Sequence, residues 1–257
     1  MKPSICILQS DGTNCDVELH YAFEKFGGKS QYVHVNELRN KEKSLKDFQI
    51  LALPGGFSYG DDIASGKILA VELMSFLRDE IEQFRERGNL IIGICNGFQT
   101  LIRTGLLPFG KLGTMDATLA TNNSGHLECR WIRLKTEKSP CVFLQGNYDI
   151  GYYSVNSGEG KFFASNETIK TIEQSQLVVF RYVDGQGKPT QQYPENPNGA
   201  LAAIAGVTDP TGRIFGMMPH PEKFVDITQF ANWRREKITK PHGAFIFEEM
   251  VKYVTHA

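Results

Sequence analysis

The chain has 257 residues, of which 41% are hydrophobic, and its formal net charge is −1. This length suits one large α/β domain or two small ones, and we expect a single domain over residues 1–257. The near-neutral charge provides no electrostatic reason to bind nucleic acid or a membrane surface. No apolar run approaches the roughly 20 residues of a transmembrane helix.

The cysteines point to a reducing compartment. There are five, an odd number, and they follow no regular spacing. Met1 leads almost directly into a strand pattern, so we expect no signal peptide and a cytoplasmic protein. His126 and Cys129 have no second pair of ligands nearby in sequence, and we expect no metal site.

The first hundred residues alternate between strand and helix patterns. We expect strands at 4–8, 31–35, 49–53 and 89–94, a helix at 16–26, and one long amphipathic helix that starts near Leu69 and ends at Gly88. This alternation predicts an α/β fold with a mostly parallel central sheet and helices on both faces. Ligands in such sheets bind beyond the carboxyl ends of the strands.

The remainder of the chain has a less regular pattern. We expect short strands and one short helix over 127–135 and 164–183, and a closing helix at 245–254. Two strands, 200–207 and 213–217, flank a turn at 209–212. The segment 184–199 is rich in Gln, Pro, Gly and Asn, and we interpret it as a long surface loop.

A nucleophile elbow is predicted at residues 93–99, Gly-Ile-Cys-Asn-Gly-Phe-Gln. An apolar strand pattern runs into it and a helical pattern follows. Gly93 and Gly97 flank Cys95 in the G-x-C-x-G form, which lets a strand and a helix approach closely around a strained residue. Cys95 would stand at a helix N-terminus, where the macrodipole favours a thiolate. A buried, unreactive thiol would not require both glycines.

The partner of this cysteine is predicted at residues 217–222, Met-Met-Pro-His-Pro-Glu. Each proline biases the residue before it toward an extended conformation. Side chains two apart in an extended chain point to the same side, so Glu222 can orient His220. The other imidazole nitrogen is then free to face Cys95, in the nucleophile–base–orienter arrangement of covalent catalysis. Alone, this run would equally suit a surface turn.

An oxyanion hole is predicted at the third motif. A buried strand pattern ends in Pro-Gly-Gly-Phe-Ser at 54–58. The backbone N–H groups of Gly56 and Asn96 are the candidates for holding a developing oxyanion. A phosphate-binding loop is the rival interpretation, but the run lacks the Lys-Ser/Thr ending of a P-loop and the spacing of a dinucleotide fingerprint. Cys15 also precedes a helix, but it lacks paired glycines, and we expect a structural or interface role for it.

These motifs resemble a known family. The elbow together with Pro-His-Pro-Glu resembles a class I (triad) glutamine amidotransferase domain, which has a flavodoxin-like architecture. The sequences of the motifs are most similar to those of the glutaminase subunits of phosphoribosylformylglycinamidine synthase, and the similarity extends over essentially the whole chain. The runs that carry it are 14–16, 54–61, 93–99, 124–131 and 216–222.

The resemblance implies an activity and its partners. Cys95, His220 and Glu222 would hydrolyse glutamine, Gly56 and Asn96 would hold the oxyanion, and Gln99 would lie beside the substrate. Ammonia would pass to a separate synthetase subunit, PurL, often accompanied by the small subunit PurS. The synthetase would use ATP and magnesium to convert formylglycinamide ribonucleotide, and this chain would bind no cofactor itself.

Two alternatives remain open, and one residue departs from the pattern. The chain could be a stand-alone cysteine hydrolase of similar fold, or a non-catalytic glutaminase-like regulatory subunit. Many members of the family have His-Gly-Glu-Gly where this chain has Ser-Gly-Glu-Gly at 157–160. No role of that histidine is therefore transferred to Ser157.

Overall fold

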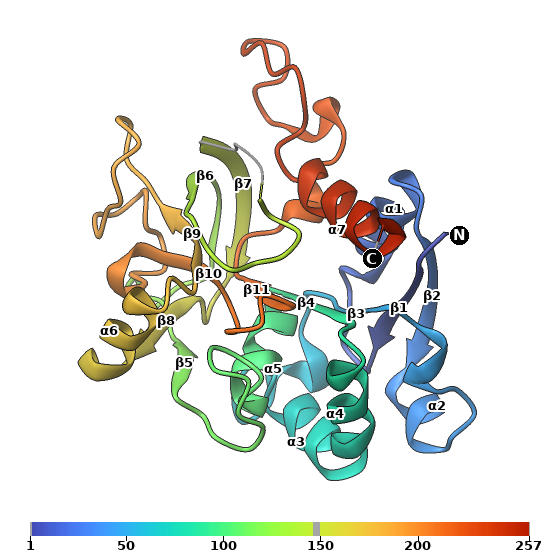
Figure 1. The fold of residues 1–257 in the computed structure, drawn as a ribbon. Coiled ribbons are helices and arrows are strands. Elements are labelled where there is room, and N and C mark those ends of the chain that lie inside the picture. Colours follow the sequence, from blue (N-terminus) through green and yellow to red (C-terminus); the bar gives the residue numbers. More distant parts are fainter. Residues whose placement is uncertain (1, 146–149, 257) are drawn as a thin grey trace.

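A nine-stranded sheet forms the centre of the molecule (Figure 1). The computed structural model describes residues 2–145 and 150–256. The strand order is β2-β1-β3-β4-β11-β10-β9-β6-β7, and β5 and β8 form a separate two-stranded sheet. The strands are β1 (Ser4–Gln9), β2 (Lys29–His34), β3 (Ile50–Leu53), β4 (Leu90–Ile94), β5 (Ala117–Ala120), β6 (Glu128–Thr136), β7 (Ile150–Ser157), β8 (Lys161–Ala164), β9 (Val178–Tyr182), β10 (Ile204–Thr208) and β11 (Ile214–Met217).

Helices cover both faces of the sheet. Helices α1 and α7 pack together on one face, and α3 packs against α5 on the other (Figure 1). The helices are α1 (Asp16–Lys25), α2 (Val35–Arg39), α3 (Lys67–Phe76), α4 (Arg78–Glu86), α5 (Asn96–Thr104), α6 (Asn166–Gln174) and α7 (Ala244–His256). The α/β class is thereby confirmed. One hydrophobic core connects the layers, and the single domain over residues 1–257 stays a prediction.

The central sheet is mixed, so the expectation of a mostly parallel sheet needs correction. Pairing is parallel along β2-β1-β3-β4-β11 and antiparallel along β11-β10-β9-β6-β7. The parallel half contains the first three predicted strands and the elbow strand β4. Its strands β3, β4 and β11 are buried along their whole length, as strands covered on both faces are.

The long helix predicted from Leu69 to Gly88 is two helices. The break is at Leu77, which has φ −121° and ψ 7° and is buried. Helix α3 packs on α5, whereas α4 packs near residues 45–47. Because the two halves face different neighbours, a bend at Leu77 buries the apolar side of each, which one straight helix would not do. Val35, predicted as a strand end, instead begins α2.

The segment 184–199 has no helix or strand, but it is a surface loop only over its first part. Residues 184–195 are exposed or partly exposed, whereas Asn196 and Asn198 are buried. The Asn198 side-chain amide donates to Asn122 Oδ1 (2.7 Å) and to Ser157 Oγ (3.1 Å). The loop end is therefore fixed by buried hydrogen bonds that composition alone does not reveal.

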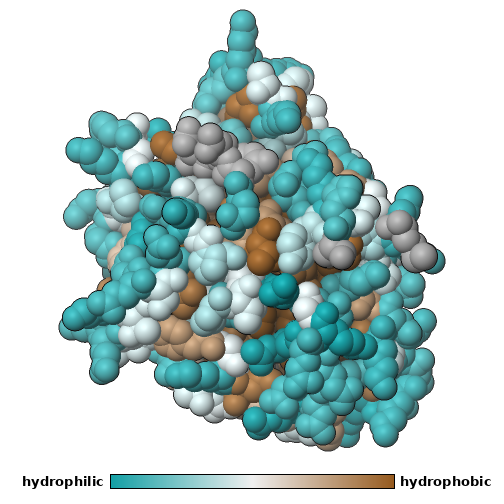
Figure 2. Space-filling model, viewed as in Figure 1, coloured by the Kyte–Doolittle hydropathy of each residue, from teal (hydrophilic) through white to brown (hydrophobic). Residues whose placement is uncertain are grey.

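The visible surface is mainly polar. Figure 2 shows one face, on which hydrophilic side chains dominate and apolar ones form small patches. Within the described ranges, no helix combines the length and the apolar character needed to cross a membrane.

Candidate active site

Cys95 is the turning point between β4 and α5, as predicted. Its backbone has φ 52° and ψ −106°, a strained conformation for a residue with a side chain. A Cβ on Gly97 would lie 2.1 Å from Leu53 O, and one on Gly93 would lie 2.7 Å from the Gly97 carbonyl. Neither glycine can therefore carry a side chain, and the elbow geometry is confirmed.

His220 and Glu222 form the predicted pair just beyond β11. The imidazole Nδ1 lies 2.5 Å from Glu222 Oε1, and the His220 backbone N–H donates to Ser154 O (2.8 Å). His220 is extended, as its proline neighbour requires, whereas Glu222 lies in a short 3-10 helix, Pro221–Lys223, rather than in an extended chain. The contact was predicted correctly, although the backbone that makes it differs.

The His220–Glu222 pair is buried. His220 is 1% exposed and Glu222 is fully buried. Burial alone lowers the pKa of His220, but the Glu222 carboxylate outweighs it, with further contributions from Cys95 and Cys15, and the pKa lies well above its usual 6.5. His220 Nε2 and Glu222 Oε2 have no hydrogen-bond partner within the described part of the chain.

Gly55 is the point where the parts of the site meet. A Cβ there would lie 2.7 Å from His220 Cε1, 3.3 Å from Cys95 Cβ and 3.4 Å from Cys15 Sγ. Cys95 and His220 are thus brought together around a residue that has no side chain. Glycine is required here by close approach, which the Gly-Gly motif indicated without identifying its neighbours.

Cys15 belongs to this cluster, which the sequence analysis did not anticipate. One ligand atom from each of Cys15, His220 and Glu222 lies within 4.8 Å of the other two. Cys15 is 5% exposed, so its position is not an interface. The only sequence signal was its place in the Asn-Cys-Asp run at 14–16, which carries the family resemblance.

Of the two candidate oxyanion donors, Asn96 directly follows Cys95, and Gly56 follows Gly55, which lies against Cys95. The Gly55 carbonyl accepts from the N–H groups of Asn14 (3.5 Å) and Cys15 (3.2 Å). Because a trans peptide points its C=O and N–H in opposite directions, the Gly56 N–H points away from that loop. Gly56 has φ +141°, which favours glycine. Asn96 is the first residue of α5, and its N–H has no acceptor within the helix.

The side chains of Asn96 and Gln99 hold neighbouring loops. Asn96 Nδ2 donates to Asp61 Oδ1 (2.8 Å) and to Gln99 Oε1 (3.0 Å), and Asn96 Oδ1 accepts from the Ser58 N–H (3.3 Å). Gln99 Nε2 donates to Glu159 O (2.6 Å). Both residues are 3% exposed. They tie the elbow to the 57–63 loop and to the 157–160 loop.

The 57–63 loop is strained and exposes apolar side chains. Tyr59, Asp61 and Ile63 all have positive φ, at 53°, 55° and 71°. Ile63 is 87% exposed and Phe57 is 43% exposed. Non-glycine residues in this region cost about 1–3 kcal/mol each, and such strain gathers at functional sites. The sequence motif identified this loop but did not predict its positive φ angles.

Ser157 is buried, and both its hydroxyl and its carbonyl form hydrogen bonds. Its hydroxyl accepts from Asn198 Nδ2 (3.1 Å), and its carbonyl accepts from Asn122 Nδ2 (2.7 Å). The neighbouring Asn156 carbonyl lies 3.7 Å from Cys95 Sγ and accepts from the thiol. The 156–160 segment therefore forms one wall of the site.

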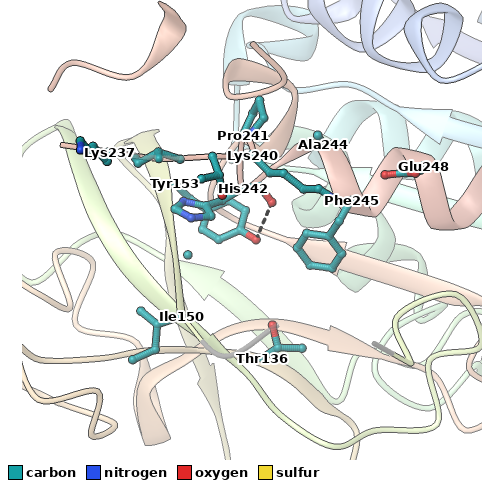
Figure 3. Close-up of a pocket in the computed structure, with 13 residues that line it drawn as sticks. Thr136, Ile150, Tyr153, Lys237, Lys240, Pro241, His242, Ala244, Phe245 and Glu248 are labelled. Atoms are coloured by element: carbon teal, nitrogen blue, oxygen red, sulfur yellow. Dashed lines mark hydrogen bonds between the residues drawn. The ribbon is translucent and has the colours of Figure 1, made fainter. Parts of the chain in front are cut away.

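A separate cavity of about 360 Å³ lies between the antiparallel half of the sheet and the segment 237–242 (Figure 3). Tyr153 and His242 face one another there, and the Tyr153 hydroxyl donates to His242 O (3.2 Å). Cys95, His220 and Glu222 are not among its lining residues. This cavity is therefore distinct from the candidate active site.

Comparison with known proteins agrees with this geometry. Residues 2–254 match the family described as the CobB/CobQ-like glutamine amidotransferase domain. The chain is 47% identical over 254 residues to "phosphoribosylformylglycinamidine synthase subunit PurQ" of Dehalococcoides mccartyi, covering 98% of each chain. It is 39% identical over 250 residues to the PurQ subunit of Methanococcus maripaludis, covering 96% of this chain and 92% of the relative.

The chain belongs to the PurQ family of glutamine amidotransferases.

Solved structures of relatives extend the comparison. The structure described as PurLQS from Thermotoga maritima matches with a TM-score of 0.75 and 31% identity, over 99% of this chain and 100% of that chain. A glutamine amidotransferase from the same organism matches with a TM-score of 0.59 at 15% identity, over 98% of this chain and 99% of that chain, and supports the fold alone. The PurQ family membership and the α/β amidotransferase fold thus agree with the resemblance found in the sequence.

Proposed function

We propose that this chain is the glutaminase subunit of phosphoribosylformylglycinamidine synthase, which hydrolyses glutamine and passes ammonia to a synthetase subunit. The observation that carries the proposal is the convergence of a strained elbow cysteine and a buried His–Glu pair around Gly55. The 47% sequence identity to a PurQ subunit, over 98% of this chain, supports the assignment of the substrate and of the reaction step.

The reaction begins at Cys95. Its sulfur attacks the side-chain amide carbon of glutamine, and the carbonyl oxygen becomes an oxyanion held by the N–H groups of Gly56 and Asn96. His220 gives a proton to the departing nitrogen, which leaves as ammonia, and a γ-glutamyl thioester remains. One oxyanion donor is worth on the order of 10²–10³ in rate.

Hydrolysis of the thioester completes the cycle. His220 takes a proton from water, the hydroxide oxygen bonds to the thioester carbon, and Cys95 leaves as glutamate is released. General acid–base catalysis of this kind contributes about 10²–10⁴ in rate. Glu222 holds the imidazole through Nδ1 and stabilises its protonated form.

Gln99 is proposed to shape the glutamine-binding wall. Its amide nitrogen is bonded to Glu159 O and its oxygen to Asn96, so its orientation is fixed before substrate arrives. A pre-oriented wall limits how glutamine can lie against Cys95. Asn96 thereby serves twice, by its backbone N–H at the oxyanion and by its side chain in the loop network.

The proposed partners are PurL and PurS. PurL would activate formylglycinamide ribonucleotide with ATP and magnesium, and would receive the ammonia made here. Free ammonia is mostly protonated at neutral pH, which is a reason to release it beside its acceptor. The match to the PurLQS structure supports this assembly. The five free cysteines support a reducing, cytoplasmic setting.

The 57–63 loop is the proposed contact through which the synthetase controls the site. It presents Phe57 and Ile63 to solvent, and Asn96 connects it directly to the elbow. Contacts from the partner would bias the loop and the adjoining Gly55–Gly56 peptide toward the conformation that accepts the oxyanion. The bias is limited by how differently the partner binds the two conformations.

The test is Cys95→Ala in the complex reconstituted with the synthetase subunits. We expect glutamine-dependent synthesis to vanish and ammonia-dependent synthesis to remain largely intact, because the elbow carries the nucleophile chemistry and none of the ATP chemistry. Loss of both activities in a folded, assembled variant would contradict this division. Retention of glutamine-dependent synthesis would show that Cys95 is not the nucleophile.

A further inference from the structure

Trp131 belongs to the sequence run 124–131, which carries part of the family resemblance but has no place in the reaction proposed above. It lies on β6, directly opposite Ser154 of β7. Because directly opposite residues of an antiparallel pair point to the same face, the indole and the Ser154 side chain share one face of this hairpin. The Ser154 carbonyl accepts the His220 N–H (2.8 Å), and the two residues form an isolated antiparallel bridge. The His220 backbone is therefore fixed to the strand with which Trp131 pairs.

The indole of Trp131 packs near the other end of the segment that begins at His220. Its ring lies edge-on to Phe224, with centroids 5.5 Å apart and planes at 85°, and edge-on to Phe230, at 5.0 Å and 89°. Phe224 and Phe230 stack on each other at 5.4 Å, and the His242 ring lies edge-on to Phe224 at 5.4 Å. Edge-to-face and stacked contacts are favoured geometries of aromatic pairs, so these rings form one packed cluster.

Phe224 ends the short 3-10 helix that contains Glu222. Its ring is fully buried, its N–H donates to Pro221 O (3.0 Å), and its carbonyl accepts from the Gly243 N–H (3.0 Å). Glu222 Oε1 contacts His220, whereas Oε2 has no hydrogen-bond partner within the described part of the chain. The position of this carboxylate therefore depends on the backbone on either side of it, which is held at Phe224 and at His220.

Trp131 thus supports the segment from His220 to Phe224 at both ends, at Phe224 by ring contact and at His220 by way of Ser154. We propose that Trp131 is a positioning residue, which sets how Glu222 meets His220 Nδ1. Loss of the indole frees the turn between the two ends, and a displacement of about 1 Å can cost about 10²-fold in rate. The effect on rate rests on the function proposed above, whereas the effect on the His220–Glu222 pair does not.

The first test is the glutaminase rate of the reconstituted complex. Trp131→Leu removes the aromatic edge, and we expect kcat to fall about 10–100-fold while KM for glutamine changes less than about threefold, because the histidine is displaced and the glutamine-binding wall is not. Trp131→Phe keeps a ring against Phe224 and should restore kcat to within about threefold of the wild type. Phe84→Leu, which removes a fully buried ring of α4, is the matched control for lost packing and should keep the wild-type rate.

The second test is the pKa of His220, followed by NMR of the imidazole in the full-length chain without glutamine. Burial lowers this pKa, whereas Glu222, Cys95 and Cys15 raise it, and it lies well above its usual 6.5. A carboxylate that moves away from Nδ1 raises the pKa less. The pKa should therefore fall in Trp131→Leu and stay unchanged in Trp131→Phe. This measurement does not depend on which substrate the chain hydrolyses.

A double substitution separates positioning from a general loosening of the fold. If Trp131 acts through Glu222, Trp131→Leu should lower kcat less than about threefold in a Glu222→Gln background. Phe224→Leu breaks the same ring contact from the other side and should repeat the losses of rate and of His220 pKa, so the test does not depend on the folding of one variant.

Three outcomes would overturn the proposal. They are equal losses of kcat in the wild-type and Glu222→Gln backgrounds, a His220 pKa that does not move in Trp131→Leu, and a fall of both rate and pKa in Phe84→Leu. A wild-type complex that releases no ammonia from glutamine would instead contradict the proposed function, and the NMR measurement would still decide whether Trp131 positions the pair.

Discussion

Two cysteines lie at the start of helices beside the same imidazole, and only one has the geometry of a nucleophile. Cys95 has φ 52° and ψ −106°, whereas Cys15 has φ −103° and ψ 17°. Cys95 and Cys15 are equally buried, at 5% exposure. Burial and helix position therefore do not distinguish the two cysteines. The strained backbone of the elbow, between two glycines, does.

The charges around the two helix starts differ as well. Helix α1 has Asp16 and Glu18 in its first turn, whereas α5 has no acidic residue in its first turn. Negative side chains therefore lie in the helix turn beside Cys15, whereas Cys95 stands at a helix N-terminus without them. The thiols also bond differently, since Cys15 donates to the Asn14 side chain (3.3 Å). Position beside a histidine is thus not enough to make a cysteine reactive.

Serine substitutions at the two positions are the strongest test of this contrast. Cys95→Ser should lower the glutaminase rate of the complex by at least about 10⁴-fold, because removing a nucleophile removes the covalent route. Cys15→Ser should lower it by less than about tenfold, since the elbow and the His–Glu pair remain. Steady-state ammonia release measures the glutaminase rate of both variants. Equal damage at the two positions would mean that Cys15 takes part in the chemistry.

The next largest effects concern the two members of the buried pair. His220→Ala should lower the rate by about 10²–10⁴-fold, and Glu222→Gln by less, because a base transfers the proton and an orienter only holds it. Because Glu222 raises the His220 pKa, Glu222→Gln should also move the alkaline limb of the pH–rate profile to lower pH. Greater damage at Glu222, or an alkaline limb that does not move, would assign Glu222 a different role.

A methyl group at Gly55 probes the point where both cysteines and the histidine meet. Gly55→Ala would place a Cβ 2.7 Å from His220 Cε1, so the imidazole must move, and a shift of about 1 Å can cost about 10²-fold in rate. Gly185→Ala is the matched control, since its nearest atom is 3.5 Å away on a flexible arginine and its φ is not positive. Thermal unfolding confirms that both variants fold. Full activity in Gly55→Ala would show that the site tolerates the displacement.

The smallest expected effect tests whether the 57–63 loop connects the elbow to the synthetase. Tyr59→Phe removes the hydroxyl that donates to Glu72, and Asp61→Asn alters the contact with Asn96. A lost hydrogen bond of about 1 kcal/mol should weaken activation by the synthetase about fivefold. Alkylation of Cys95 by a small electrophile in the isolated chain should change less. If the isolated chain hydrolyses glutamine as fast as the complex does, the gating hypothesis is wrong.

The sequence was sufficient for the strands of the parallel half of the fold and for the local geometry of the candidate site. Strands β1, β3 and β4 are short, continuous apolar runs bounded by turn residues, and such local patterns survive without knowledge of their neighbours. The glycines around Cys95 and the prolines around His220 act on the backbone of adjacent residues. The elbow and the His–Glu contact were therefore predictable from short motifs.

The tertiary structure decided what depends on distant residues. The antiparallel half, the break at Leu77 and the buried end of the 184–199 loop are set by packing partners that no local pattern names. Cys15 is the clearest case, because 205 positions separate it from His220 and only the sheet order brings their loops together at Gly55. Hydrophobic periodicity indicates which face of an element is buried, but not which distant side chains pack against that face. Cys15 lies in the candidate active site because of such a long-range contact.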